Sequence, residues 1–214
     1  MLFNSLDFAL FLPITFLLYW YVFKKSLKIQ NLFLLIASYI FYGWWDYRFL
    51  ALIIFSTLVD YFIGINLQKE SNQRKRKYLL WLSIIVNLGF LGFFKYFNFF
   101  IDNFVSAFSF FGKEIGVSSL NIILPVGISF YTFQTLSYTI DVYKNTLKPT
   151  HNFIVFAGFV SFFPQLVAGP IERATNLLPQ FYAHRKKDIQ KIKDGLRQIL
   201  WGLFKKVVIA DNCA

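Results

Sequence analysis

The sequence has few charged residues for its length and almost no cysteine. Only 15% of its 214 residues are charged, and Cys213 is its single cysteine. One cysteine excludes a small scaffold held together by disulfides. An average soluble domain is about 25% charged and about 45–50% apolar, whereas 57% of this chain is hydrophobic and 21% is aromatic. The composition therefore excludes a water-soluble domain, a disordered chain and a conventional nucleic-acid-binding protein.

Long apolar runs fill much of the chain. Stretches with no Asp, Glu, Lys, Arg or His cover residues 8–23, 29–45, 78–94, 120–140 and 152–171, and a further run at 49–67 contains only Asp60. A helix needs roughly 20 residues to cross the hydrocarbon core of a membrane. We therefore expect an all-α polytopic membrane protein, a helical bundle of one domain. Its membrane helices are expected at 6–23, 29–45, 47–66, 78–97 and 119–143.

The excess of basic residues is unevenly distributed. The chain carries 22 basic and 11 acidic residues, a formal net charge of +11. The basic residues concentrate at 24–28 and 69–77, whereas 46–48 holds one aspartate and one arginine. Cytoplasmic loops of membrane proteins carry an excess of Lys and Arg, so we expect both basic stretches in the cytoplasm and the N-terminus outside. The basic run at 69–77 is expected to be a solvated loop.

Proline and glycine interrupt two of the apolar runs. Pro125 and Gly127 lie within the last predicted membrane helix, where a proline removes a backbone donor, so this helix should be kinked or broken. The run at 151–171 contains Pro164 and has basic residues on both flanks. We expect it to enter the membrane and turn back as a re-entrant segment. Residues 98–118, aromatic and sparsely charged, should lie in the outer interface.

The last part of the chain has a different pattern. Apolar side chains recur at helical spacing over residues 194–210, with Lys205 and Lys206 on the opposite face. This pattern predicts an amphipathic helix at the cytoplasmic interface. The alternative, a further membrane helix, would place both lysines in mid-span at a cost of several kcal/mol.

The motifs of soluble enzymes are absent. The sequence has no Walker loop, no G-x-G-x-x-G fingerprint, no HExxH, no G-x-S-x-G elbow and no metal-spaced cluster of Cys and His. Its two histidines, His151 and His184, have no neighbouring partner in sequence to orient a general base. We interpret both as solvated interfacial residues and expect no metal site.

Ionisable residues within apolar runs are better candidates for a site, because burying a charge in lipid is costly. Asp60, Lys95 and Asp141 are the residues of this kind. One interpretation is that they pair with each other or with helix ends to fix packing. The other is that Asp141, with Gln134 before it, lines a polar passage beside the proline break. Further polar candidates straddle the PQLVAGPIER turn, namely Gln165, Glu172 and Arg173.

Several blocks of the sequence, in order, carry a resemblance to a known family. They are LLIASYIFYGWWDYRFL, LVDYFIG, LGFFKYFNFFIDNF, ILPVGISFYTFQTLSYTIDVYK, SFFPQLVAGPIERA and LWGLFKKVVIADN. The chain resembles the N-terminal half of the membrane-bound O-acyltransferase superfamily, in its bacterial alginate O-acetyltransferase branch. The resemblance covers the chain from Met1 to its last residue.

The resemblance implies a bowl of helices in the bacterial inner membrane around a tunnel. An activated acyl donor, acetyl-coenzyme A or another acyl carrier, would enter from the cytoplasm, and a hydroxyl of an exopolysaccharide such as alginate would accept the acyl group outside. The family's catalytic histidine would lie beyond Ala214, so this chain is expected to hold no catalytic residue and to be inactive alone. No bound cofactor is expected. Expected partners are the lipid bilayer, the polysaccharide and other exopolysaccharide-modification proteins, with no nucleic acid.

The resemblance also suggests roles for the polar candidates. Gln134, Asp141, Gln165, Glu172 and Arg173 would line the tunnel. The basic residues Arg185, Lys186 and Lys187 would lie at the donor mouth and attract a phosphate-bearing donor, although a role at the lipid surface explains the same charges. Two other function classes stay open: a transporter or channel, favoured by broken helices and intramembrane charges, and a non-catalytic membrane scaffold.

Overall fold

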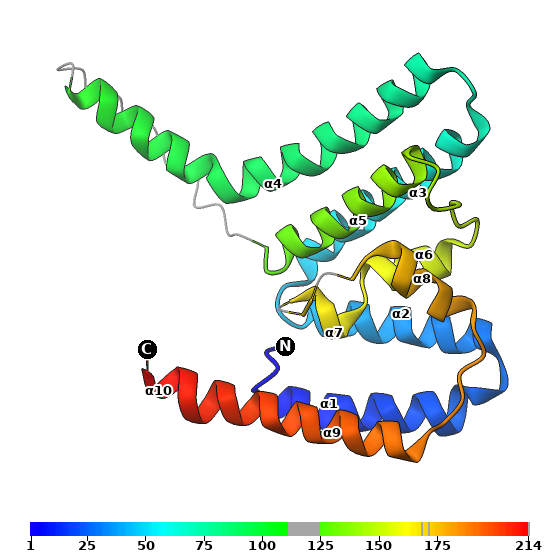
Figure 1. The fold of residues 1–214 in the computed structure, drawn as a ribbon. Helices are drawn as coiled ribbons and strands as arrows, with labels where there is room; N and C mark the ends of the chain where they lie inside the picture. The colour runs from blue at the N-terminus through cyan, green and yellow to red at the C-terminus, as the bar shows by residue number, and fades with distance from the viewer. Residues whose placement is uncertain (111–124, 168, 171, 214) are drawn as a thin grey trace.

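The computed structural model describes residues 1–110, 125–167, 169–170 and 172–213. In these residues the regular structure is helical, with no strand. Three helical segments are long and apolar enough to cross a membrane, Leu6–Lys25, Tyr47–Lys69 and Gln73–Val105. The predicted fold class is confirmed: the protein is an all-α membrane protein with several membrane helices, arranged as shown in Figure 1.

The first two helices form a hairpin. Helix α1, Leu6–Leu17, begins where the Ser5 hydroxyl accepts a hydrogen bond of 3.2 Å from the Phe8 amide, and it continues through a π-helical turn, Leu18–Val22, and a 3₁₀ turn, Phe23–Lys25. Helix α2, Leu27–Gly43, returns alongside and is apolar but only 17 residues long.

The next helix begins at a short capped turn. The Asp46 carboxylate accepts a hydrogen bond of 2.9 Å from the Arg48 amide at the start of a 3₁₀ turn, Tyr47–Phe49. Helix α3, Leu50–Lys69, follows. Arg48 also forms an ion pair of 2.6 Å with the same carboxylate, so both charges of this connection are used locally.

Helix α4, Gln73–Phe110, is longer than the predicted 78–97 helix. The helix continues through residues 98–110, where the sequence has no proline or glycine to end it. The expected location of residues 98–118 in the outer interface stays a prediction. Residues 111–118 of that expectation lie outside the described residues. Figure 1 shows α4 bent in its middle, so that its second half projects away from the bundle. Gly89 and Gly92 occupy the middle of the helix, and glycines are a usual cause of such bends.

One residue of the basic run before α4 departs from the sequence prediction. Arg76 is only 8% exposed, so the interpretation of the whole 69–77 run as a solvated loop is wrong at this position. Its guanidinium donates to the Leu67 carbonyl at the end of α3, and to the Tyr143 carbonyl at 2.7 Å and the Asn145 side-chain oxygen at 2.9 Å. Arg76 therefore satisfies carbonyls at the C-terminal ends of two helices, which would otherwise be left without donors.

The predicted break at Pro125 and Gly127 is present. Helix α5, Ile128–Tyr143, begins directly after Gly127, which has a φ of +80°. A Cβ atom at Gly127 would lie 2.5 Å from the Leu166 carbonyl oxygen, so only glycine fits here. The part of the predicted helix at 119–124 lies outside the described residues. Helix α5 lies at the centre of the bundle and packs against α3 and α4.

The chain breaks again and reverses after α5. Helix α6, Phe153–Val160, ends at Ser161, and the short helix α7, Phe163–Leu166, follows with Pro164 in its first turn. The Ser38 hydroxyl from α2 accepts a hydrogen bond of 3.2 Å from the Phe163 amide at the start of α7. Helix α8, Ala174–Tyr182, then packs back against α6 (Figure 1).

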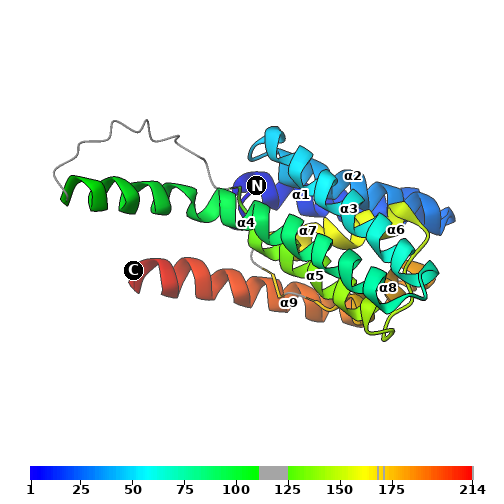
Figure 2. The same cartoon turned by 90° about the horizontal axis from the view of Figure 1, so that it is seen from above.

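The last helical segment is separate from this core. Helix α9, Ile189–Phe204, continues without interruption through a π-helical turn, Lys205–Ala210, and α10, Asp211–Cys213, and none of its residues is buried. Figures 1 and 2 show α9 running along the direction of α1 and not across it. That direction suits the alternative of a further membrane helix, and its location at the cytoplasmic interface stays a prediction.

Candidate functional site

A polar cluster lies inside the bundle, where α3, α4 and α5 meet. The Asp60 carboxyl group is completely buried. It accepts hydrogen bonds from the Ser83 hydroxyl, from the Asn87 amide at 2.8 Å and from the Thr139 hydroxyl at 3.1 Å. Asp60 thus joins three helices through its two oxygens, which is how a membrane protein accommodates a polar group at depth.

The same cluster extends through the Asn87 side chain. Its oxygen accepts hydrogen bonds from the Ser56 hydroxyl at 2.8 Å and from the Thr135 hydroxyl at 3.1 Å. Each helix therefore contributes two polar residues four positions apart, a spacing that puts both on one helix face. The six residues, which we call the Asp60 cluster, are Ser56, Asp60, Ser83, Asn87, Thr135 and Thr139.

Sequence reasoning identified only Asp60 of this cluster. The signal for the rest was present, since polar pairs with the same four-residue spacing recur in three apolar runs. One interpretation of the sequence is that Asp60, Lys95 and Asp141 pair with each other or with helix ends. Within the described residues they do not pair with each other: Lys95 is exposed, with its ammonium 5.4 Å from the centre of the Tyr96 ring. Asp141 is half-buried near the end of α5, where its backbone carbonyl accepts hydrogen bonds from Thr146.

Two of the predicted polar candidates meet at the break between α6 and α7. Gln134 from α5 donates a hydrogen bond of 2.7 Å from its side-chain amide to the Phe159 carbonyl oxygen, and the Gln165 amide lies 3.5 Å from the same oxygen. Both glutamines are buried, at 2% and 6% exposure. A broken helix frees carbonyls at its last turn, and these amides satisfy one of them. The arrangement places two buried amide side chains at the interruption between α6 and α7.

The other predicted tunnel residues are not part of this meeting point. Glu172 and Arg173 are exposed in the connection between α7 and α8, where Arg173 directly precedes the first turn of α8. Asp141 lies about two helical turns along α5 from Gln134. The structure therefore brings Gln134 and Gln165 together and leaves Asp141, Glu172 and Arg173 apart from them.

The predicted donor-mouth residues lie in the connection between α8 and α9, residues 183–188. The Arg185 guanidinium is half-buried and donates a hydrogen bond of 2.7 Å to the Asn31 side-chain oxygen at the start of α2. It also lies 5.4 Å from the centre of the Tyr19 ring and 5.7 Å from that of Phe181. Burial lowers the pKa of Arg185 from its ordinary value, although a guanidinium stays protonated in proteins.

The two neighbouring lysines are exposed. Lys187 donates a hydrogen bond of 2.5 Å to the Tyr21 hydroxyl, and its ammonium lies 4.4 Å from the centre of that ring. No carboxylate among the described residues forms an ion pair with Arg185, Lys186 or Lys187. The two exposed lysines therefore keep their charge available at one end of the bundle.

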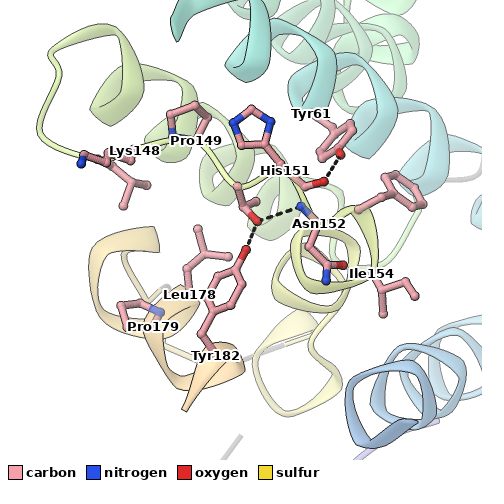
Figure 3. Close-up of a pocket in the computed structure, with 12 residues that line it drawn as sticks. Tyr61, Lys148, Pro149, His151, Asn152, Ile154, Leu178, Pro179 and Tyr182 are labelled. Atoms are coloured by element: carbon pink, nitrogen blue, oxygen red, sulfur yellow. Dashed lines mark hydrogen bonds between the residues drawn. The ribbon is translucent and has the colours of Figure 1, made fainter. Parts of the chain in front are cut away.

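A separate open pocket of about 990 Å³ lies between α8, the loop 147–152 and α3 (Figure 3). At its centre the Thr150 hydroxyl contacts the Tyr182 hydroxyl and accepts a hydrogen bond of 3.3 Å from the Asn152 amide. The Tyr61 hydroxyl donates 2.6 Å to the His151 carbonyl. The His151 ring itself is exposed, with Nε2 lying 3.1 Å from the Gln68 side-chain oxygen. Sequence reasoning treated His151 as a solvated residue and missed this pocket.

The described residues contain no group of three or more His, Cys, Asp or Glu side chains that could hold a metal ion. The fold and these clusters define a class of protein: an all-α membrane protein with polar side chains gathered at two points inside its bundle.

Comparisons with known proteins identify relatives of this chain. Over its full length it is 42% identical to the probable alginate O-acetylase AlgI of Pseudomonas aeruginosa, covering 41% of that protein. It is 41% identical to a probable alginate O-acetylase of Azotobacter vinelandii, covering 42% of it. It is 37% identical to a peptidoglycan O-acetyltransferase of Helicobacter pylori, covering 45% of it. No family model and no solved structure matches the chain.

These relatives confirm the resemblance to the alginate O-acetyltransferase branch of the membrane-bound O-acyltransferases. The chain spans about two fifths of the length of the curated relatives that it matches.

Proposed function

We propose that this chain supplies part of the membrane domain of an O-acetyltransferase that acts on a polysaccharide. The observation that carries the proposal is the 42% identity to a probable alginate O-acetylase, which extends over the whole chain. Alginate is the favoured acceptor because several of the relatives are named for it. The peptidoglycan O-acetyltransferase relative makes a cell-wall polymer the second candidate.

The proposed reaction moves an acetyl group from an activated carrier to a sugar hydroxyl. The hydroxyl oxygen attacks the acetyl carbonyl carbon, a new carbon–oxygen bond forms, and the bond between the acetyl group and its carrier breaks. The hydroxyl proton passes to a general base, which the family resemblance places beyond Ala214. Acetyl-coenzyme A, or another activated acyl carrier, is the proposed donor.

In the proposed reaction this chain provides part of the wall of the passage and the residues at its donor entrance. We assign Gln134 and Gln165 to the wall of the passage, since both are buried and converge at the α6–α7 break. Asp141, Glu172 and Arg173, which lie apart from that point, stay proposed lining residues. Buried amides at an interruption are suited to polar contact with a substrate that crosses apolar surroundings.

The proposed topology puts the donor and the acceptor on opposite sides of the bacterial inner membrane. The N-terminus would lie outside, and residues 24–28 and 69–77 would lie in the cytoplasm, as the charge distribution favours. Arg185, Lys186 and Lys187 would then face the cytoplasm, where cations without carboxylate partners can attract a phosphate-bearing donor. Other exopolysaccharide-modification proteins are proposed partners on the outer side.

The test is to express the complete reading frame in an alginate-producing Pseudomonas strain that lacks its own O-acetylase. The acetyl ester content of the secreted alginate and of the peptidoglycan is then measured by nuclear magnetic resonance. Restored alginate esters support the proposal, and residues 1–214 expressed alone should restore none. Absence of esters from both polymers, with the protein present in the membrane, would contradict it.

The role of the glutamines can be separated in the same strain. Gln134→Leu keeps the size of the side chain but removes the amide, and it should lower ester content several-fold. Gln180→Leu, the same substitution at an exposed glutamine on α8, serves as the matched control. Equal ester content in both variants would remove Gln134 from the passage.

A further inference from the structure

The pocket beside α8 has two chemically different ends. Its walls are largely apolar, formed by Leu147, Pro149, Phe153, Ile154, Leu178 and Pro179. Lys148 lies at the outer edge of the lining residues (Figure 3), and the exposed His151 lies beside α3. None of the lining residues is acidic. The pocket therefore combines an apolar surface with a lysine at its edge.

The position of the pocket along α3 sets its depth in the membrane. Tyr61 lies eight residues before Lys69, the last residue of the α3 span, which corresponds to about 12 Å of helix. Gln68, which contacts His151, lies at the end of the same helix. The lining thus extends from the charged end of a membrane helix into its apolar part, across the headgroup region where tyrosine side chains are common.

Hydroxyl side chains are among the lining residues, including those of the exposed Tyr182 and of Thr150, which is only 5% exposed. The hydroxyls of Thr150 and Tyr182 contact each other, and the Asn152 amide donates to Thr150. The lining thus combines a lysine, hydroxyl and amide groups, and aliphatic side chains. An anionic phospholipid offers groups that match each of these, with a phosphate, a glycerol ester region and acyl chains.

We propose that this pocket binds an anionic phospholipid, with the headgroup phosphate at Lys148 and an acyl chain along Ile154 and Phe153. Basic pockets beside membrane helices are suited to anionic headgroups, and the cytoplasmic leaflet, where this end of α3 is proposed to lie, is rich in them. A small soluble anion would leave the apolar walls uncovered. This site does not depend on acyl transfer, so it can be tested even if the proposed function fails.

The experiment is native mass spectrometry of the full 214-residue chain, purified in mild detergent, stripped of lipid and titrated with defined phospholipids. Wild-type protein should bind phosphatidylglycerol about tenfold more tightly than phosphatidylcholine. Lys148→Glu should remove this preference, because it reverses the charge that faces the phosphate. Lys144→Glu changes a lysine of the same basic stretch that does not line the pocket, and it should behave as wild type.

A second pair of variants tests the apolar wall. Ile154→Trp fills the pocket and should reduce binding of both lipids several-fold, whereas Ile85→Trp replaces an isoleucine that is 64% exposed on α4 and should leave binding unchanged. Gel filtration of each variant verifies that it is folded and monodisperse.

Three results would overturn the proposal. The first is equal phosphatidylglycerol affinity in Lys148→Glu and Lys144→Glu, and the second is equal affinity of the wild type for both lipids. The third is displacement of phosphatidylglycerol by coenzyme A or by inorganic phosphate at millimolar concentration, which would assign the site to a soluble phosphate compound. If excess phosphatidylglycerol displaces the bound lipid and neither coenzyme A nor inorganic phosphate does, the result supports the lipid site.

Discussion

The Asp60 cluster and the C-terminal helix differ in how they accommodate polar groups. In the Asp60 cluster, polar side chains from three helices are buried and bonded to each other. In the helix from α9 to α10 none of the residues is buried, and several of its polar side chains pair along the helix itself. There Lys206 pairs with Asp211, and the Lys205 ammonium lies 5.2 Å from the centre of the Trp201 ring.

The difference shows that polar residues at helical spacing can be bonded in two ways, either to neighbouring helices or along their own helix. The polar groups of the Asp60 cluster find their hydrogen-bond partners within the bundle, because an unpaired group in an apolar environment costs free energy. Polar groups on a helix with no packed neighbour depend on local contacts between side chains. Substitutions should therefore have large effects in the first region and small effects in the second.

The largest effect is expected at the centre of the Asp60 cluster. Asp60→Ala removes the acceptor of three hydrogen bonds and leaves Ser83, Asn87 and Thr139 without it. Hydrogen bonds between membrane helices contribute about 0.6 kcal/mol on average and up to about 1.7, so we expect a loss of about 3 kcal/mol. Reversible unfolding in mixed detergent, followed by circular dichroism, measures it. Asp141→Ala, at a half-buried site outside the cluster, should change stability by less than about 0.5 kcal/mol; equal losses at both positions would contradict the cluster's role.

Arg76 should give the next largest effect. Arg76→Met keeps much of the side-chain volume but leaves the carbonyls of Leu67 and Tyr143 without their charged donor. Hydrogen bonds to charged groups contribute about 1.5–3 kcal/mol, and we expect a loss of about 2 kcal/mol by the same unfolding measurement. The neighbouring Arg74 is exposed, so Arg74→Met is the control. If Arg74→Met were as destabilising as Arg76→Met, net charge and not the capping of two helices would explain both.

Substitutions at two glycines should have opposite signs. Gly127→Ala places a Cβ against the Leu166 carbonyl at a position with φ of +80°, and we expect it to destabilise by about 1–2 kcal/mol. Gly89 lies within α4, and its Cβ would meet no atom within 4 Å. Gly89→Ala should therefore stabilise by about 0.5–1 kcal/mol, because alanine favours a helix more than glycine does. The shift of the thermal midpoint in detergent distinguishes the two, and a lowered midpoint for Gly89→Ala would show that the bend in α4 needs this glycine.

The smallest effect is expected in the C-terminal helix. Leu200 is 70% exposed, so Leu200→Ala should change the stability of this chain by less than about 0.5 kcal/mol. The same truncation at Leu67, which is completely buried, should cost about 2–5 kcal/mol. Both values come from unfolding of the 214-residue chain. A large loss at Leu200 would mean that α9 packs against the bundle in solution.

Much of the helical architecture could be predicted from local signals. Pro125 with Gly127 predicted the interruption before α5, and Pro164 predicted the one between α6 and α7, because proline removes a donor and glycine permits a positive φ. The length of α4 was missed because the aromatic, sparsely charged stretch after residue 97 was interpreted as a segment lying in the outer interface and not as a continuation of the helix. Hydropathy describes the surroundings of a helix, whereas its end depends on capping and on breakers.

The candidate site was predicted in part. Gln134, Gln165 and Asp60 were each recognised as polar residues in apolar runs, and each is buried. Their partners were not recognised, because a single serine, threonine or asparagine is common in a membrane helix and does not by itself indicate a polar site. The four-residue spacing of Ser83 and Asn87 could have been noticed, but nothing in one helix identifies which residues of another it faces.

By itself, the sequence determined that the protein resides in a membrane, that its fold is helical and where several of its helices are interrupted. These properties follow from side-chain hydropathy and from the backbone chemistry of proline and glycine, which act locally. The tertiary structure alone decided that Asp60 is bonded by three donors, that Arg76 is buried between two helix ends, and that a pocket opens beside α8. Such contacts join residues that are tens of positions apart, and they exist only once the helices have packed.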